Sequence, residues 1–203
     1  MIELACIAVD PSALPERTDL RALFENENPI ELEIGCGKGA FLLRQARAHP
    51  ERNFVGIEWA NKYFKYAVDR MARWGLNNVR IMRTDGREFV MRRLAPECLS
   101  ALHIYHPDPW PKKRHLRRRL IQPALMEAAV RALKPGGRLA IQTDHAEYFE
   151  QIRQVTFARQ ELTPVAFEDD AFGTAEGDVK SNFEIKYRRE GREIYRLAFR
   201  RMA

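Results

Sequence analysis

The sequence has only three cysteines, Cys6, Cys36 and Cys98, and they lie far apart. An odd number of isolated cysteines excludes a disulfide framework, and without a CxxC pair there is no sign of a metal site. This cysteine usage favours a reducing compartment and predicts a cytoplasmic location. The sequence also lacks an apolar run near the ~18 residues of a membrane span. Its first twenty residues carry acidic side chains and no sustained apolar stretch, which is not typical of a signal peptide.

The chain has 203 residues, 45% of them hydrophobic and 31% charged, which predicts one domain with a sizeable core. Lys and Arg number 34 against 28 Asp and Glu, a net charge of +6. Residues 112–119 contain six cations and no acid, and the rest of the chain is balanced at 28 cations and 28 acids. Because the whole positive excess lies in eight residues, the sequence predicts a polyanionic partner.

Strand and helix patterns alternate along the chain. We expect helices at 40–48, 60–74, 86–94, 116–133 and 144–157, and strands at 30–34, 53–58, 78–82, 101–105, 138–143, 162–167 and 193–199. This order predicts a mostly parallel seven-stranded sheet with helices on both faces. The last two strands have no predicted helix between them, which indicates an antiparallel edge strand.

Three glycines follow the first of these strands, at Gly35, Gly37 and Gly39. Glycine allows the backbone to turn sharply and to approach a ligand closely. The spacing is GxGxG rather than GxGxxG, so a plain tight turn between strand and helix remains the alternative to a nucleotide-binding loop.

Acidic residues follow three other predicted strands. Glu58 lies 19 residues after Gly39, where a carboxylate can accept both hydroxyls of a ribose. Asp85 and Asp108 come after the third and fourth strands. A solvated acid is the alternative at Glu58, and an Asx turn or helix cap at Asp85. Ligands of open α/β sheets bind at the carboxyl ends of the strands, so these acids and the glycines predict one site.

Glu33 stands inside an apolar strand, where an unpartnered charge is costly. A cationic ligand would be a suitable partner. S-adenosylmethionine carries a sulfonium and an amino group, whereas a nicotinamide dinucleotide carries a pyrophosphate. Several acids and no pyrophosphate signal favour S-adenosylmethionine as the cofactor.

The segment 106–119 combines a constrained acid, an aromatic ring and the basic run. Asp108 lies between Pro107 and Pro109, which restrict the backbone on both sides. Trp110 follows and offers a flat face for a base. The cations come next, at the start of a predicted helix, where the helix dipole disfavours positive charge. A phosphate backbone explains them better than a merely solvated face.

Several motifs occur together in the order of a known family: Glu33-Ile-Gly-Cys-Gly-Lys-Gly39, Gly56-Ile-Glu58, Asp85, Pro107-Asp-Pro-Trp-Pro-Lys-Lys-Arg-His115, Thr143-Asp144 and Ser181-Asn-Phe-Glu184. The chain resembles the bacterial tRNA (guanine-N7-)-methyltransferases, which methylate guanine 46 in the variable loop of tRNA. The resemblance covers about residues 30–200, and the Pro-Asp-Pro-Trp block with its basic run is its most specific part. It implies a Rossmann-like class I methyltransferase domain at 30–203, preceded by an N-terminal extension at 1–29.

The resemblance also implies roles for individual residues. By position, the S-adenosylmethionine-binding residues are Glu33, Gly35, Gly37, Gly39, Glu58, Asp85 and Asp108, and Asp108 is also the catalytic residue. The substrate-binding positions are Lys112, Asp144, Ser181, Asn182, Phe183 and Glu184. Asn182 departs from the family, which often has a lysine there. The charge pattern adds the predicted RNA backbone contacts Lys113, Arg114, Arg117, Arg118 and Arg119.

Two other functions remain open at this point. The first is an amino methyltransferase that acts on another nucleic-acid base or on a protein glutamine, although Pro107–Trp110 matches the motif of those enzymes only loosely. The second is a dinucleotide-dependent oxidoreductase or a non-catalytic RNA-binding module, neither of which explains Glu33, Asp85 and Asp108 together. The expected partner is tRNA, without a metal or a membrane, and the sequence leaves a monomer and a homodimer equally open.

Overall fold

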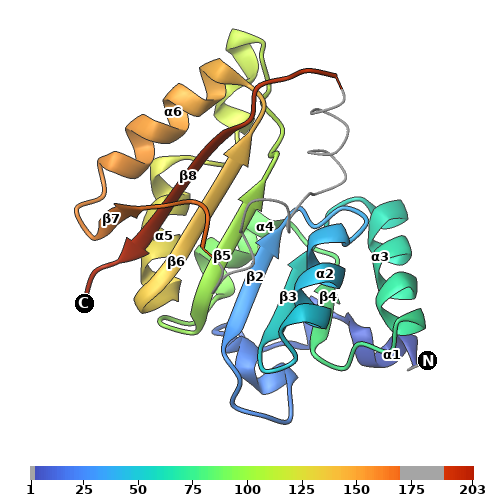
Figure 1. Cartoon of the computed structure of the whole chain (residues 1–203). Coiled ribbons are helices and arrows are strands. Elements are labelled where there is room, and N and C mark those ends of the chain that lie inside the picture. The colour runs from blue at the N-terminus through green and yellow to red at the C-terminus, as the bar shows by residue number, and fades with distance from the viewer. Residues whose placement is uncertain (1–2, 170–189) are drawn as a thin grey trace.

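The computed structural model describes residues 3–169 and 190–203 (Figure 1). Its centre is an eight-stranded sheet with the order β1-β4-β3-β2-β5-β6-β8-β7. The strands are β1 (Ala8–Val9), β2 (Ile30–Ile34), β3 (Asn53–Ile57), β4 (Val79–Met82), β5 (Leu99–Tyr105), β6 (Leu133–Thr143), β7 (Leu162–Val165) and β8 (Tyr195–Arg201).

Strands β1 to β6 pair in parallel, and β8 lies antiparallel between β6 and β7. The predicted fold class, a mostly parallel sheet with an antiparallel strand at one side, is therefore confirmed. The sheet has one strand more than predicted. That strand is β1, which belongs to the segment before residue 30 and pairs with β4 at the other edge of the sheet.

Helices cover both faces of the sheet (Figure 1). The α-helices are α1 (Leu4–Ile7), α2 (Ala40–Ala48), α3 (Asn61–Arg73), α4 (Gly86–Glu88), α5 (Pro123–Ala132) and α6 (Ala146–Phe157). The shorter turns are the 3-10 helices η1 (Pro11–Ala13), η2 (Leu20–Leu23) and η4 (Lys113–Arg118) and the π-helical turn η3 (Phe89–Arg93). One buried cluster joins the sheet to α5, α6 and η3, and the other joins it to α2 and α3.

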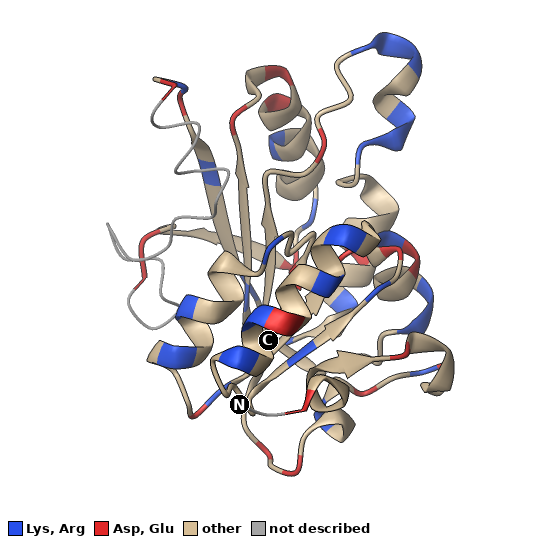
Figure 2. Cartoon of the chain, turned by 90° about the vertical axis from the view of Figure 1, so that its right-hand side faces the viewer, with Lys and Arg blue, Asp and Glu red and all other residues tan. Residues whose placement is uncertain are grey.

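The prediction of one long helix over 116–133 is wrong. The basic run instead forms η4, which ends at Arg118, and α5 begins only at Pro123. Proline disfavours a helical conformation in the residue before it, and Gln122 is accordingly extended, with φ −132° and ψ 161°. Pro123 then occupies the first turn of α5, where its missing N–H costs nothing. The cations therefore lie on a separate short element that projects from the sheet (Figure 2).

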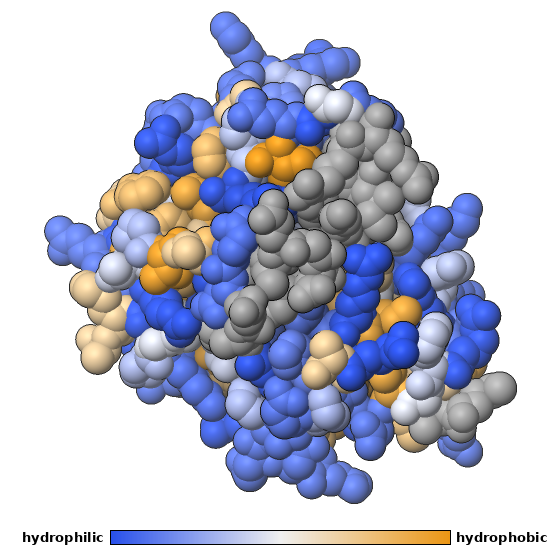
Figure 3. Space-filling view, viewed as in Figure 1, coloured by the Kyte–Doolittle hydropathy of each residue, from blue (hydrophilic) through white to orange (hydrophobic). Residues whose placement is uncertain are grey.

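Two smaller differences follow from local backbone geometry. The predicted helix 86–94 is a short α-helix, α4, that continues as the π-helical turn η3. Residues 135–137, which separate the predicted helix 116–133 from the predicted strand 138–143, form an irregularity inside β6, which already starts at Leu133. Within the described residues, no helix has the length and hydropathy of a membrane-spanning helix. On the face seen in Figure 1, hydrophilic residues predominate and the apolar patches are small and separate (Figure 3).

Candidate active site

The loop after β2 depends on its glycines. Gly35, Gly37 and Gly39 have φ values of 78°, 54° and 67°, which residues other than glycine rarely adopt. Gly39 also lies close to α3, because an added Cβ would lie 2.6 Å from Met71 Cε and 3.3 Å from Ala67 Cβ. The glycines thus let the loop turn back from β2 and pack closely on α3.

Glu58, at the end of β3, holds this loop in place. Its Oε2 accepts a hydrogen bond from the Gly37 N–H at 2.8 Å, and its Oε1 accepts one from the Ala60 N–H at 2.7 Å. The carboxylate is buried, and residue 58 lines the cleft described below. Its two backbone donors fix the orientation of a charged group next to the glycine loop.

Glu33 is the most unusual acid of the site. Its residue is 4% exposed, and its Oε2 has no hydrogen-bond partner among the described residues. Burial, and to a lesser degree the charge of Glu58, raises the pKa of Glu33 to about 8. A nearby positive charge would favour the ionised form and offset the cost of burial, so Glu33 is suited to a cationic or hydrogen-bonding ligand.

Asp85 caps a helix, as the structural alternative predicted. Its Oδ1 accepts hydrogen bonds from the N–H groups of Arg87, at 2.8 Å, and Glu88, at 3.1 Å. The following Gly86 packs against β2, since an added Cβ would lie 2.5 Å from Ile34 Cγ2. Asp85 also lines the cleft, so the capping role and a binding role are compatible.

These residues surround a cleft of about 700 Å³ at the carboxyl ends of the parallel strands. The predicted site residues that line it are Gly35, Gly37, Glu58, Asp85 and Asp108. Glu33 and Gly39 are not among the lining residues: Glu33 lies inside β2, and Gly39 packs on α3. One cleft therefore collects residues that are up to 86 positions apart in the sequence, from Ile34 to Leu120.

The sequence reasoning missed several residues of the cleft: Lys38, Trp59, Tyr63, Thr84, Arg87 and His106. Trp59 is 70% exposed, although it directly follows a buried strand and Glu58. A tryptophan at the end of a strand, outside the core pattern, is the sequence signal that could have identified Trp59.

The segment that carries Asp108 has unusual backbone geometry. His106 has φ 51° and Trp110 has φ 42°, both in the left-handed region. Asp108 lies between them, exposed at the rim of the cleft. The Trp110 ring is held by the Arg118 guanidinium, 5.1 Å from the ring centroid, and by the edge of His115, at 5.7 Å. Trp110 thus links Asp108 to η4.

Arg119 differs from the other cations of the basic run. Its residue is 2% exposed, and its guanidinium donates to the Pro109 carbonyl at 2.7 Å, to Gln151 Oε1 at 2.8 Å and to Glu147 Oε1 at 3.0 Å. The predicted phosphate contact is therefore wrong for Arg119, because its donors are already used inside the protein. It fastens the Asp108 segment to α6.

The remaining cations of the run, Lys112, Lys113, Arg114, Arg117 and Arg118, are exposed. Arg118 also lines the cleft. Figure 2 shows η4 as a predominantly basic element above the sheet. The basic run therefore reaches the cleft at Arg118, and its other exposed cations lie on the surface outside the cleft lining.

Asp144 lies beside the cleft rather than in its lining. Its Oδ2 accepts a hydrogen bond from Arg192 Nη1 at 2.8 Å, and its Oδ1 is 3.5 Å from His106 Nδ1. His106 in turn lines the cleft. The predicted substrate-binding residues Ser181, Asn182, Phe183 and Glu184 lie outside the described residues.

Comparison with known proteins places this arrangement in a family. A family model described as "Putative methyltransferase" matches residues 27–197. A tRNA (guanine-N(7)-)-methyltransferase of Nitrosococcus oceani is 37% identical over 90% of this chain and 76% of its own length. One of Geobacter metallireducens is 33% identical over 100% of this chain and 97% of its own length. The chain belongs to the tRNA (guanine-N7-)-methyltransferase family. The predicted resemblance is confirmed.

Solved structures with low sequence identity share the fold. The antibiotic-resistance methyltransferase Kmr has a TM-score of 0.58 at 16% identity and covers 91% of this chain and 92% of its own. The Haemonchus contortus phosphoethanolamine N-methyltransferase 2, in complex with S-adenosyl-L-methionine, has a TM-score of 0.55 at 14% identity and covers 91% of this chain and 51% of its own. These likenesses confirm the Rossmann-like methyltransferase fold, and the bound ligand of the second structure is the cofactor that the sequence predicted.

Proposed function

We propose that this protein methylates N7 of guanine 46 in the variable loop of tRNA, with S-adenosylmethionine as the methyl donor. Family membership supports the class of reaction, and the choice of guanine 46 rests on the motifs shared with bacterial members. One observation carries the proposal: a single cleft is lined on one side by the glycine loop with Glu58 and on the other by Asp108 and Arg118, the last residue of the basic η4.

The acids in the cleft and the buried Glu33 on β2 fit this cofactor. Glu58 is oriented by two backbone donors and has the acceptor oxygens that ribose hydroxyls need. The buried Glu33, whose Oε2 has no partner among the described residues, matches a cationic group. We assign cofactor binding to these two acids, to the glycine loop and to Asp85. When bound, S-adenosylmethionine supplies an electrophilic methyl group on a cationic sulfur.

The protein's task in this reaction is orientation. Guanine N7 carries a lone pair and no proton, so no residue has to act as a base before the bond forms. Alignment of the reacting groups is worth roughly 7–11 kcal/mol in favourable cases. The methylated purine is positively charged, and a carboxylate close to it stabilises the charge that develops. We assign this role to Asp108, which is exposed at the rim of the cleft.

The substrate is bound on the side of η4. N7 lies on the Hoogsteen edge, so the base must leave its stack to reach the cleft. We assign phosphate contacts to Lys113, Arg114, Arg117 and Arg118, and substrate contacts to Lys112 and Asp144. Besides this contact, Asp144 pairs with Arg192 and lies next to His106, which lines the cleft. A tRNA substrate also agrees with the predicted cytoplasmic location.

The test is transfer of a radiolabelled methyl group to bulk tRNA, followed by analysis of the nucleosides. We expect the label on N7-methylguanosine, and we expect a transcript with guanine 46 replaced by adenine to remain unlabelled. Label on N6 of adenine would establish the amino methyltransferase alternative instead. Label on N7 of a different guanine would contradict the choice of guanine 46 but not the methylation of guanine N7 in tRNA.

A further inference from the structure

We infer that the outer face of α3, together with Lys38, is a second RNA-contact surface on the opposite rim of the cleft from η4. The inference rests on the proposed function and adds a second element to the RNA site. The α3 surface is defined here by Lys38, Lys62, Tyr63, Lys65 and Tyr66. All five side chains are exposed in the structure.

The two lysines of α3 on this surface do not stabilise the helix that carries them. Lys62 and Lys65 lie in its first two turns, where the positive end of the helix dipole disfavours cations. Neither lysine has an ion-pair partner among the described residues. The acid of this helix, Asp69, pairs instead with Arg73 at 2.7 Å, one turn further along. Two unneutralised cations at a helix start favour a polyanionic ligand.

The aromatic residues of the α3 surface fit bases. Tyr63 is 40% and Tyr66 46% exposed, although burial of such rings would stabilise the fold. Lys38 Nζ lies 5.6 Å from the centroid of the Tyr66 ring, and the Lys38 carbonyl accepts a hydrogen bond from Arg70 Nη1 at 3.3 Å. These contacts fasten the glycine loop to the middle of α3. Exposed rings interleaved with cations are the pattern of proteins that stack single-stranded bases.

The position of the α3 surface beside the cleft favours RNA over another polyanionic ligand. Lys38 and Tyr63 line the cleft from one side, and Arg118 of η4 lines it from the other. Figure 2 shows α3 facing the viewer with its lysine and arginine residues, and η4 above it. A strand that delivers a flipped base into the cleft has neighbouring nucleotides on both sides of that base. The α3 surface is placed to contact the nucleotides on the side away from η4.

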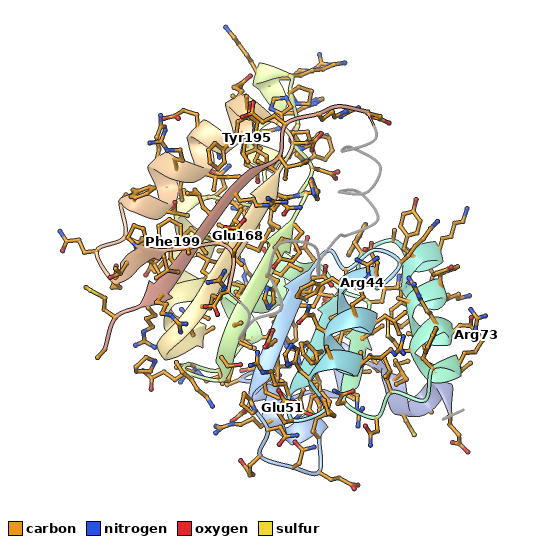
Figure 4. The ribbon with its side chains drawn as sticks, in the orientation of Figure 1. Arg44, Glu51, Arg73, Glu168, Tyr195 and Phe199 are labelled. Carbon is orange, nitrogen blue, oxygen red and sulfur yellow. The ribbon has the colours of Figure 1, made fainter. Side chains whose placement is uncertain are left out.

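The first experiment tests the charges by measuring tRNA binding at several salt concentrations. Each lost phosphate contact on a single strand flattens the log–log salt dependence by about 0.7. We expect Lys62→Ala/Lys65→Ala to flatten the slope by roughly 1.4 for two contacts. The control is Arg73→Ala/Arg153→Ala, which removes two exposed arginines that are paired with Asp69 and Glu150. Arg73 lies on the outer side of α3 (Figure 4), and the control should keep the wild-type slope.

The second experiment tests stacking at Tyr66, which does not line the cleft. Loss of a stacked base weakens binding by about 5- to 150-fold, so Tyr66→Ala should raise the Kd for tRNA within this range. Tyr66→Phe keeps the ring and should bind tRNA as the wild type does. Calorimetry with S-adenosylmethionine should give the same Kd for the wild type and for every variant, which shows that the fold and cofactor site are intact.

The outcomes separate this inference from the proposed function. If the wild type methylates N7 of guanine in tRNA but the lysine and Tyr66→Ala variants keep its slope and Kd, the α3 surface does not contact RNA. An effect of Tyr66→Phe equal to that of Tyr66→Ala would exclude stacking. If the wild type itself transfers no methyl group to tRNA, the proposed function is wrong, whatever the binding experiments show for the α3 surface.

Discussion

Glu58 combines a buried position with two backbone donors, Gly37 N–H and Ala60 N–H. Charge-assisted hydrogen bonds contribute roughly 1.5–3 kcal/mol each, so Glu58→Ala should weaken the binding of S-adenosylmethionine by about 10-fold or more. The affinity for tRNA should stay close to that of the wild type. Calorimetry with each ligand measures both values, and Glu88→Ala, at an exposed acid, is the control. An unchanged cofactor affinity would remove Glu58 from the site.

Glu33 should make the stability of the ligand-free protein depend on pH. Because burial raises its pKa from 4.5 to about 8, Glu33 favours the folded state only while it is protonated. Its contribution is fully present below about pH 4.5 and is lost as the pH rises through about 8. Glu33→Gln keeps the neutral form, so its Tm should equal that of the wild type near about pH 5 and exceed it at about pH 8.5. Parallel Tm curves across this range would show that Glu33 does not titrate as described.

Asp108 should matter for turnover more than for binding. Asp108→Asn keeps the shape of the side chain and removes the charge that opposes a cationic product, which we expect to lower kcat by about 100-fold or more. Steady-state kinetics at saturating tRNA and S-adenosylmethionine measure this effect, and a filter-binding assay should give nearly the wild-type Kd for tRNA. A variant with wild-type kcat would end the assignment of Asp108 as the catalytic residue.

The residues of the site were predictable to different degrees, for physical reasons. Glu33 and Glu58 were recognisable because an acid inside or at the end of an apolar strand is unusual. The structural role of Arg119 was not recognisable, because in the sequence it is one of six cations in a run. Nothing in that run indicates the carbonyl and side-chain oxygens to which its guanidinium donates. Tyr63 has the same type of spacing as a core residue, and only the orientation of α3 shows that it is exposed.

At the scale of elements, η4 separates binding cations from a structural one. Arg117→Ala/Arg118→Ala should flatten the salt dependence of tRNA binding by roughly 1.4–1.8, for two contacts with single-stranded or duplex RNA, and leave Tm nearly unchanged. Arg119→Ala should instead lower the free energy of unfolding by about 2–4 kcal/mol, because it removes a buried side chain and its three hydrogen bonds. Salt titrations and urea unfolding of both variants measure the two effects. If Arg119→Ala changed the slope of the salt dependence and left the free energy of unfolding unchanged, Arg119 would be an RNA contact and not a structural residue.

The division between η4 and α5 shows where helix prediction from sequence fails. The helices α2, α3 and α6 follow their apolar periodicity to within two residues of the predicted bounds. Between Leu116 and Leu133 the apolar pattern is also continuous, and it predicts one helix. The interruption comes from Pro123, whose restriction of Gln122 is local and outweighs the periodicity. The result is a projecting basic element instead of the first turn of a packed helix.

At the scale of the whole molecule, the sheet determines which distant residues meet. The parallel strands bring the loops after β2, β3, β4 and β5 to one edge, which is why alternation of strands and helices sufficed to predict the cleft. The two-residue strand β1 was not predictable, because its pairing with β4 leaves no periodic signal in two positions. The depth of the cleft and its aromatic rim depend on side-chain packing between elements, which the sequence does not encode locally.

A chain of buried polar groups crosses this sheet towards the cleft. Arg52 Nη1 donates to Glu31 Oε1 at 2.8 Å, and His103 Nε2 lies 2.8 Å from Glu31 Oε2. An ionised carboxylate only accepts hydrogen bonds, so His103 donates from Nε2. His103 Nδ1 lies 2.9 Å from the hydroxyl oxygen of Tyr105, a residue that lines the cleft. The chain thus joins the start of β3 to the cleft through β2 and β5.

This chain should make the protein sensitive to acid. Burial alone would raise the pKa of Glu31, but the hydrogen bonds and charges of His103 and Arg52 outweigh it, and the pKa lies below its usual value of 4.5. Glu31 therefore stabilises the fold above about pH 4.5, and this contribution is lost as the pH falls through its lowered pKa.

Glu31→Gln tests this sensitivity directly. At about pH 7 we expect it to cost 3–5 kcal/mol of unfolding free energy, because it leaves the buried partners of the carboxylate uncompensated. The difference from the wild type should shrink as the pH falls below about 4.5, since the wild type then loses the same interaction. Urea unfolding at several pH values measures it, and Glu150→Gln, at an exposed acid of α6, should follow the wild type throughout. A constant difference between Glu31→Gln and the wild type at all pH values would show that packing, and not the charge of Glu31, stabilises this part of the sheet.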